Sequence, residues 1–171
     1  PFKNDSNSLN KAFYNELLYI IGLEEIPENG RKIIDRKKES DRQFGMLLEN
    51  IYIILKYEEL TSKVKNIEQY GDEEETQLTN IALELSILWI NRILFLKLLE
   101  AQLLKYHQNK PEYKFLTYKN LPTFGEVNKL FFRVLAKRTY ERNGVVSPKF
   151  RNIPYLNSSL FEISALEDET I

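Results

Sequence analysis

The stretch IALELSILWINRILFLKLLEAQLL, from Ile81 to Leu104, most constrains the fold of this chain. It is long enough to cross a bilayer as a helix, for which about 20 apolar residues are needed. Four charged residues interrupt it, namely Glu84, Arg92, Lys97 and Glu100. Each such charge costs roughly 2.5–3.5 kcal/mol near a bilayer centre. We therefore predict no membrane span, but a central helix that neighbouring elements cover on several sides.

Composition allows one helical domain with a real core, because 43% of the 171 residues are hydrophobic. Lys and Arg number 24 against 25 Asp and Glu, so net charge alone indicates neither a nucleic-acid partner nor an acidic one. The chain has no cysteine, which excludes disulfides, thiolate nucleophiles and Cys-ligated zinc. With no charged-then-apolar leader at its start, we expect a cytoplasmic protein.

The spacing of apolar residues predicts four principal helices, at Ser8–Ile21, Asp41–Glu59, Asp72–Gln108 and Thr123–Arg138. Ser8 is the expected cap of the first helix and Gly22 its stop. Thr123 and Glu126 stand in capping-box register at the start of the fourth.

The same spacing predicts which side chains are buried. We expect Phe13 and Phe44 to lie on the apolar stripes of the first two helices. On the central helix, Trp89, Leu94 and Leu98 are expected in the core.

The segments between the helices contain little regular structure. A Pro-Glu-Asn-Gly turn precedes a short extended piece at Arg31–Arg36, and YKFLTYKNLP at 113–122 offers a second piece that could pair with it. After Asn143 the sequence is typical of loop. We predict an all-α fold, an irregular bundle of about four principal helices around the long central one, with at most one small two-stranded ribbon and an extended C-terminal tail.

Few residues suggest catalysis. His107 is the single histidine and has no cysteine partner, and no glycine-rich phosphate loop is present. The stretch KIIDRKK has the local form of a nuclease strand, in which Asp35 and Lys37 would flank a metal-bound water. Such a site needs a second carboxylate on a preceding strand. We expect a helix ending in Glu24 and Glu25 there, so we assign no catalytic and no metal-binding residue.

A cluster of basic residues is the remaining candidate site. Its members are Arg31, Lys32, Arg36, Lys37, Lys38 and Arg42. Such residues can contact DNA phosphates without reading base sequence, although a solvated charged face is the alternative. A second group, Lys137, Arg138 and Arg142, follows the fourth helix, where cations are favoured in any case.

Four stretches resemble the helical region that precedes the methyltransferase domain in bacterial type IIG restriction-modification enzymes. They are FYNELLYIIGLEE, WINRILFLKLLEAQLL, VNKLFFRVLAKR and NIPYLNSSLFE. In that family the last phrase is close to PYLNGGLFE. Here Ser158 and Ser159 stand where the glycines usually are.

The resemblance implies an excised piece of a longer enzyme, with a helical connector at 1–143 and a tail at 144–171 leading toward a methyltransferase. The parent would be a restriction endonuclease with adenine-specific DNA methyltransferase activity, using S-adenosylmethionine and Mg²⁺. The piece itself would have no catalytic activity and no cofactor. Its expected partners are the flanking nuclease and methyltransferase modules and, weakly, the DNA backbone. An independent helical protein-interaction module is the alternative.

Overall fold

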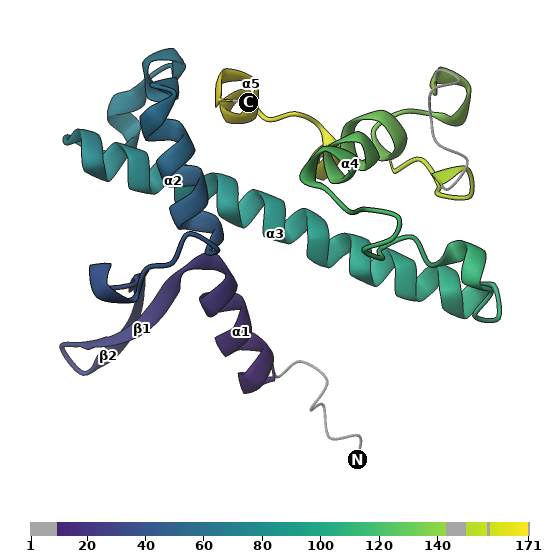
Figure 1. The fold of residues 1–171 in the computed structure, drawn as a ribbon, viewed down its shortest axis with the longest axis horizontal. Coiled ribbons are helices and arrows are strands. Elements are labelled where there is room, and N and C mark those ends of the chain that lie inside the picture. The colour runs from purple at the N-terminus through teal and green to yellow at the C-terminus, as the bar shows by residue number, and fades with distance from the viewer. Residues whose placement is uncertain (1–9, 143–149, 157, 171) are drawn as a thin grey trace. The chain divides into compact units, whose positions relative to one another are not determined.

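The computed structural model describes residues 10–142, 150–156 and 158–170 (Figure 1). Within these ranges it contains α1 (Lys11–Ile21), α2 (Leu47–Tyr57), α3 (Glu74–Tyr106), α4 (Phe124–Lys129) and α5 (Ala165–Thr170), and an antiparallel ribbon of β1 (Leu23–Glu28) and β2 (Arg31–Arg36). The chain is mainly helical, with one long helix and one small ribbon, as predicted. No helix in the described ranges is long and apolar enough to cross a membrane.

The chain divides into two units, and each is described by itself. Unit 1 comprises Pro1–Ile87 and Glu169–Ile171, and unit 2 comprises Leu88–Asp168. Both α3 and α5 contribute residues to each unit. The domain boundary predicted between residues 143 and 144 lies outside the described residues.

Helix α1 ends where predicted but begins later and is less buried than expected. The side chain of Asn10 caps it by accepting from the Ala12 amide at 2.9 Å, whereas Ser8 lies outside the described residues. Gly22 ends the helix at φ 99°, a left-handed conformation that suits glycine. The described residues cover the apolar stripe of α1 only in part, because Phe13 is 44% and Ile20 42% exposed, whereas Leu17 is half-buried.

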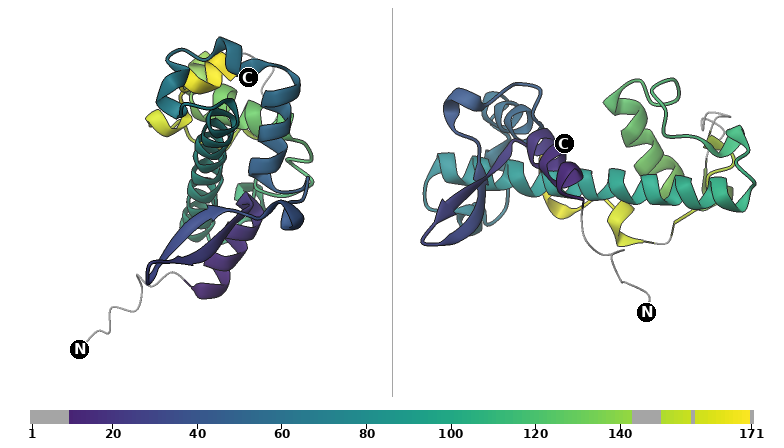
Figure 2. Two further views of the ribbon diagram at one scale, coloured as in Figure 1. Left: turned by 90° about the vertical axis from the view of Figure 1, so that its left-hand side faces the viewer. Right: turned by 90° about the horizontal axis from the view of Figure 1, so that it is seen from below.

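The two strands form a local hairpin (Figure 2). Asn29 and Gly30 both have positive φ, 50° and 77°, as a two-residue type I′ turn requires. Glu28 therefore faces Arg31, and Leu23 faces Arg36 at the other end. The predicted pairing of Arg31–Arg36 with 113–122 is wrong, because the tight turn gives β2 a partner next to it in sequence.

Helix α2 begins at Leu47 rather than Asp41. Met46 is extended, with φ −76° and ψ 138°, and its side chain is buried. It packs so close to Gly22 that a Cβ on that glycine would lie 3.2 Å from the Met46 Cβ. Phe44, predicted on the buried stripe, is 79% exposed. Its place in the core is taken by Met46, two residues later.

The core of unit 2 is aromatic. Trp89 is buried, as predicted, and its ring centroid lies 5.0 Å from that of Phe131. The rest of the buried cluster is Leu96, Phe115, Leu130, Val134, Leu135, Phe150, Ile153 and Phe161.

The predicted inner face of α3 is wrong in this unit. Leu98 is 67% exposed and Leu94 only half-buried, whereas Leu96 is fully buried. Leu96 shares its face with two charged residues, Arg92 and Glu100, one turn to either side, and both are buried. A prediction that places every charged residue in solvent therefore assigns the buried face of α3 about half a turn away from its true position.

Helix α4 continues into a π-helical turn. Thr123 caps α4 through its hydroxyl, which accepts from the Glu126 amide at 3.4 Å. Leu130–Leu135 then form a π-helix, in which the Ala136 amide donates to the Phe131 carbonyl at 3.1 Å. The helical spacing of Val127, Leu130, Phe131 and Val134 predicts a buried stripe here, which is confirmed for the last three, whereas Val127 is only half-buried.

The described part of the predicted tail is not extended. Phe150, Ile153 and Phe161 are buried in the core of unit 2. Ser159–Phe161 form a 3₁₀ turn, and α5 follows. Proline and serine make this stretch resemble a loop in sequence, but its large apolar side chains need cover from water.

Candidate functional site

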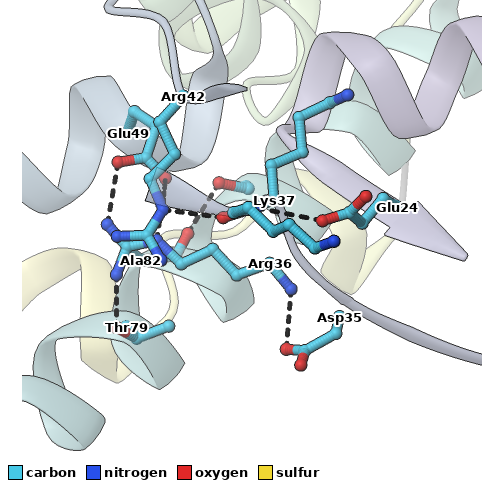
Figure 3. A network of polar contacts seen from close by, with 10 residues as sticks. Glu24, Asp35, Arg36, Lys37, Arg42, Glu49, Thr79 and Ala82 are labelled. Carbon is cyan, nitrogen blue, oxygen red and sulfur yellow. Dashed lines mark hydrogen bonds and ion pairs between the residues drawn. The ribbon is translucent and has the colours of Figure 1, made fainter. Parts of the chain in front are cut away.

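Arg36, at the end of β2, turns inward (Figure 3). Its guanidinium donates to both carboxylate oxygens of Glu49 on α2, at 2.7 and 2.8 Å, and to the Thr79 hydroxyl on α3 at 2.9 Å. It also lies 4.3 Å from the centre of the Tyr52 ring. The hydrogen bonds to Glu49 raise the pKa of Arg36. Arg36 thus fastens the ribbon to the helices of unit 1.

Arg42 is partly engaged in the same network. Its Nε donates to the Lys37 carbonyl at 2.7 Å and lies 3.8 Å from the Glu49 carboxylate. Beside it is a surface hollow of about 360 Å³. The hollow is lined by Arg36, Glu39, Arg42, Gln43, Phe44, Glu49, Tyr52, Ile53, Lys56 and Glu75. Three cations and three carboxylates line it, so it has no net attraction for an anion.

Lys32 pairs across the ribbon. Its Nζ lies 2.7 Å from the Glu25 carboxylate, which also accepts from the Tyr14 hydroxyl at 2.8 Å. The hydrogen bond from Lys32, followed by that from Tyr14, lowers the pKa of Glu25. The same hydrogen bond raises the pKa of Lys32. All three groups are on the surface, where such pairs contribute little to stability.

Three members of the basic cluster form no salt bridge with another described residue and are the candidates for contact with a phosphate. In the described part of the chain, salt bridges engage Lys32, Arg36 and Arg42 but not Arg31, Lys37 or Lys38. Arg31 and Lys38 are exposed, and the Lys37 ammonium lies 5.6 Å from the centre of the Tyr19 ring. The structure does not bring all six residues together on one open face.

The element before the nuclease-like stretch KIIDRKK is a strand and not the expected helix. Glu24 and Glu25 lie on a strand, and Glu24 faces Asp35 directly. However, Asp35 accepts from the Arg36 amide at 2.7 Å and Glu24 from the Lys38 amide at 3.0 Å (Figure 3). Over residues 10–142, 150–156 and 158–170 no three carboxylate or histidine side chains gather as metal ligands.

Arginines of the second basic group form hydrogen bonds within unit 2. Arg142 donates to the carbonyls of Lys137 at 3.1 Å and Ile153 at 2.8 Å. Its partial burial lowers its pKa. Arg138 donates to the Tyr140 hydroxyl at 3.1 Å. Arg142 therefore holds the segment around Ile153, a role that the sequence pattern did not suggest.

Arg92 on α3 is fully buried and was not among the predicted site residues. Its Nε donates to the Leu160 carbonyl at 2.6 Å and its Nη2 to the Glu162 carbonyl at 2.8 Å. Both of its terminal nitrogens bind the buried carboxylate of Glu167 on α5. A charge in the middle of an apolar run was the one sequence signal for this anchor.

Glu100, two turns further along α3, anchors a second connection. One of its carboxylate oxygens accepts from the Leu116 amide at 2.5 Å, and the other lies 3.4 Å from the Lys97 ammonium. Leu116 follows the buried Phe115, so this contact fixes the chain where it enters the core. His107 plays no comparable part and stacks on Tyr113 with ring centroids 3.7 Å apart.

The contact between Arg92 and Glu167 predicts a pH dependence. Burial alone would raise the pKa of Glu167, but hydrogen bonds from Arg92 and Ser164 outweigh it and leave the pKa below the ordinary value of 4.5. A lowered pKa means that the unfolded chain binds the proton more readily. The stabilisation is therefore complete above pH 4.5 and lost as pH falls below it.

Urea unfolding followed between pH 7 and pH 3 measures this effect. We expect the free energy of unfolding of the wild type to fall more steeply below the ordinary carboxyl pKa than that of Glu167→Gln, whose side chain does not titrate. Parallel curves for the two proteins would contradict the assignment.

The fold and its anchors define a helical domain in which buried charged residues fasten the connections. Residues 6–171 match the family model described as Domain of unknown function (DUF7814), and the chain belongs to this family. No curated protein and no solved structure matches it significantly.

Proposed function

We propose that this chain is a helical connector of a type IIG restriction-modification enzyme, in which helices packed as a bundle around α3 separate a nuclease module from an adenine methyltransferase module. In this proposal S-adenosylmethionine and Mg²⁺ act in the flanking modules. In this proposal the chain itself fixes the separation of the two modules and contributes no catalytic residue.

The fixed position of residues 152–156 and 158–162, the described part of the stretch NIPYLNSSLFE, is the observation that supports the proposal. Ile153 and Phe161 are buried, and the Leu156 amide donates to the Leu135 carbonyl at 3.0 Å. Arg92 holds the carbonyls of Leu160 and Glu162. In the family that the sequence resembles, this phrase leads into the methyltransferase. A stretch held by buried side chains and by several hydrogen bonds suits a connector, because it sets the direction in which the chain leaves toward the next module.

The reading frame of the parent gene tests this proposal. We expect the codons after Ile171 to encode an S-adenosylmethionine-binding loop and an Asn-Pro-Pro-Tyr motif. A frame that lacks both would reject the connector function.

DNA contact is the second part of the proposal, now limited to Arg31, Lys37 and Lys38. Three phosphate contacts predict that the logarithm of the binding constant falls with the logarithm of salt concentration at a slope of about −2.7. Replacing Lys37 and Lys38 with alanine should flatten the slope to about −0.9. Fluorescence anisotropy of a labelled duplex at several salt concentrations measures it.

Lys63 provides the control, because it is an exposed lysine of the same unit outside the basic cluster. Lys63→Ala should leave the slope unchanged. Binding whose slope ignores Lys37 and Lys38, or no binding at about 10 mM salt, where screening is weakest, would reject the phosphate contact.

The alternative function, an independent protein-interaction module, is favoured by α1. Phe13 and Ile20 on its apolar stripe are exposed, and Tyr19 beside them is 48% exposed. Exposed apolar side chains at this helical spacing can receive a partner helix. The same reading frame discriminates between the two functions.

A further inference from the structure

Residues 158–170 form a short segment, here called the latch, with its own local structure. The Ser158 hydroxyl accepts from the Leu160 amide at 3.3 Å and so caps the start of the 3₁₀ turn. Ser164 and Glu167 then form a reciprocal pair at the start of α5. The Ser164 hydroxyl accepts from the Glu167 amide at 3.2 Å, and the Glu167 carboxylate accepts from the Ser164 amide at 2.9 Å. This is the geometry of a capping box.

The carboxylate of the capping box is also the partner of Arg92. The Glu167 oxygen that accepts from Ser164 accepts from Arg92 Nη2 at 2.8 Å. Among the described residues, all hydrogen bonds donated by the Arg92 side chain go to Leu160, Glu162 and Glu167, which belong to the latch. One carboxylate therefore both starts α5 and binds α3.

Each half of this arrangement stabilises the other when the latch is docked. Helix α5 spans Ala165–Thr170, far shorter than the 12–15 residues that a helix needs to be even marginally stable alone in water. Arg92 lies among aromatic rings, with its guanidinium carbon 5.0 Å from the centre of the Phe132 ring and 5.6 Å from that of Phe131. A buried guanidinium without a carboxylate is strongly unfavourable.

We propose that the latch folds and docks on Arg92 as one unit, and is released and unfolded as one unit while the rest of unit 1 and of unit 2 stays folded. Its consequence rests on the proposed function. In the parent enzyme, a docked latch holds the next module at a fixed separation. A released latch of this length adds up to about 45 Å of flexible reach, at roughly 3.3–3.6 Å per residue. The latch is thus the moving part of the connector.

Hydrogen exchange of backbone amides in the full chain, followed by NMR, tests the proposal. Ser164→Ala removes the cap hydroxyl without touching Arg92. If the latch acts as one unit, the amides of Leu160, Phe161 and Glu162 should exchange about fivefold faster, together with that of Asp168, a factor that corresponds to the typical loss of a helix cap. None of the first three amides contacts Ser164. Ser159→Ala is the matched control, because Ser159 is an exposed serine of the same segment, and it should change nothing.

Two outcomes would overturn the proposal. Faster exchange confined to α5 would mean that Ser164 is only a local cap. Equally faster exchange of the α3 amides around Arg92 would mean that the latch cannot leave without unfolding the unit. Glu167→Gln provides a second check and should accelerate the same latch amides, so no acceleration there would also count against it. These measurements test the latch in this chain alone. Their outcome does not depend on what the parent reading frame encodes, so failure of the latch proposal can be told apart from failure of the connector function.

Discussion

Replacing Glu49 with alanine is expected to lower the free energy of unfolding by about 3–5 kcal/mol, the usual cost of leaving one partner of a buried ion pair alone. The side chains of Arg36 and Glu49 are only 9% and 8% exposed. Without the carboxylate, the Arg36 side chain would keep, among the described residues, the Thr79 hydroxyl as its one hydrogen-bond acceptor. Urea unfolding followed by far-ultraviolet circular dichroism measures the loss.

Two further variants isolate the cause of this loss. Glu39→Ala removes an exposed glutamate from the same hollow and should change stability by less than about 0.5 kcal/mol. Replacing both partners, as Arg36→Met with Glu49→Leu, should recover most of the loss, because no unpaired charge is then buried. A double variant as unstable as Glu49→Ala would show that packing, rather than the unpaired charge, is responsible.

Leu96→Ala is expected to cost roughly 2–5 kcal/mol, the range for truncating a buried leucine. Leu96 is fully buried in unit 2, whereas Leu98, on the same helix, is 67% exposed. Leu98→Ala is the matched control and should cost less than about 0.5 kcal/mol. Trp89 fluorescence during urea unfolding reports on this unit, because Trp89 lies in the same buried cluster. Equal losses for the two variants would contradict the orientation of α3.

Helix boundaries that depend on local chemistry could be predicted from the sequence. The ends of α3 agree with prediction within two residues, and Gly22 and Thr123 act as the stop and the cap expected of them. These signals lie within one turn of the boundary that they set, so no tertiary information is needed.

Strand β1 was missed because its sequence is a poor strand. Glu24, Glu25 and Pro27 are residue types depleted from strands. The strand exists because Asn29 and Gly30 turn the chain back on itself, and because Glu25 meets Lys32 on the other strand. The sequence did indicate the turn and the second strand, which was predicted as an extended piece at Arg31–Arg36.

The orientation of charged residues was the main source of error at the candidate site. The side chains of Arg36 and Arg92 both turn inward, against the rule that charges face water. Their partners explain it, but Glu49 lies on another element and Glu167 is far along the chain. No pattern of spacing links such pairs, so a single sequence could not predict them.

The π-helical turn at Leu130–Leu135 makes the fold sensitive to the length of the chain at this point. A π-helical turn holds one residue more than the regular helix around it, and such turns behave as single-residue insertions. Deleting one residue there would restore the regular period and rotate everything beyond it by about 100° around the helix axis. The group from Lys137 to Arg142 would then leave its register with Ile153. A one-residue deletion at this turn is therefore expected to disturb the fold more than a substitution of Arg133, its exposed residue.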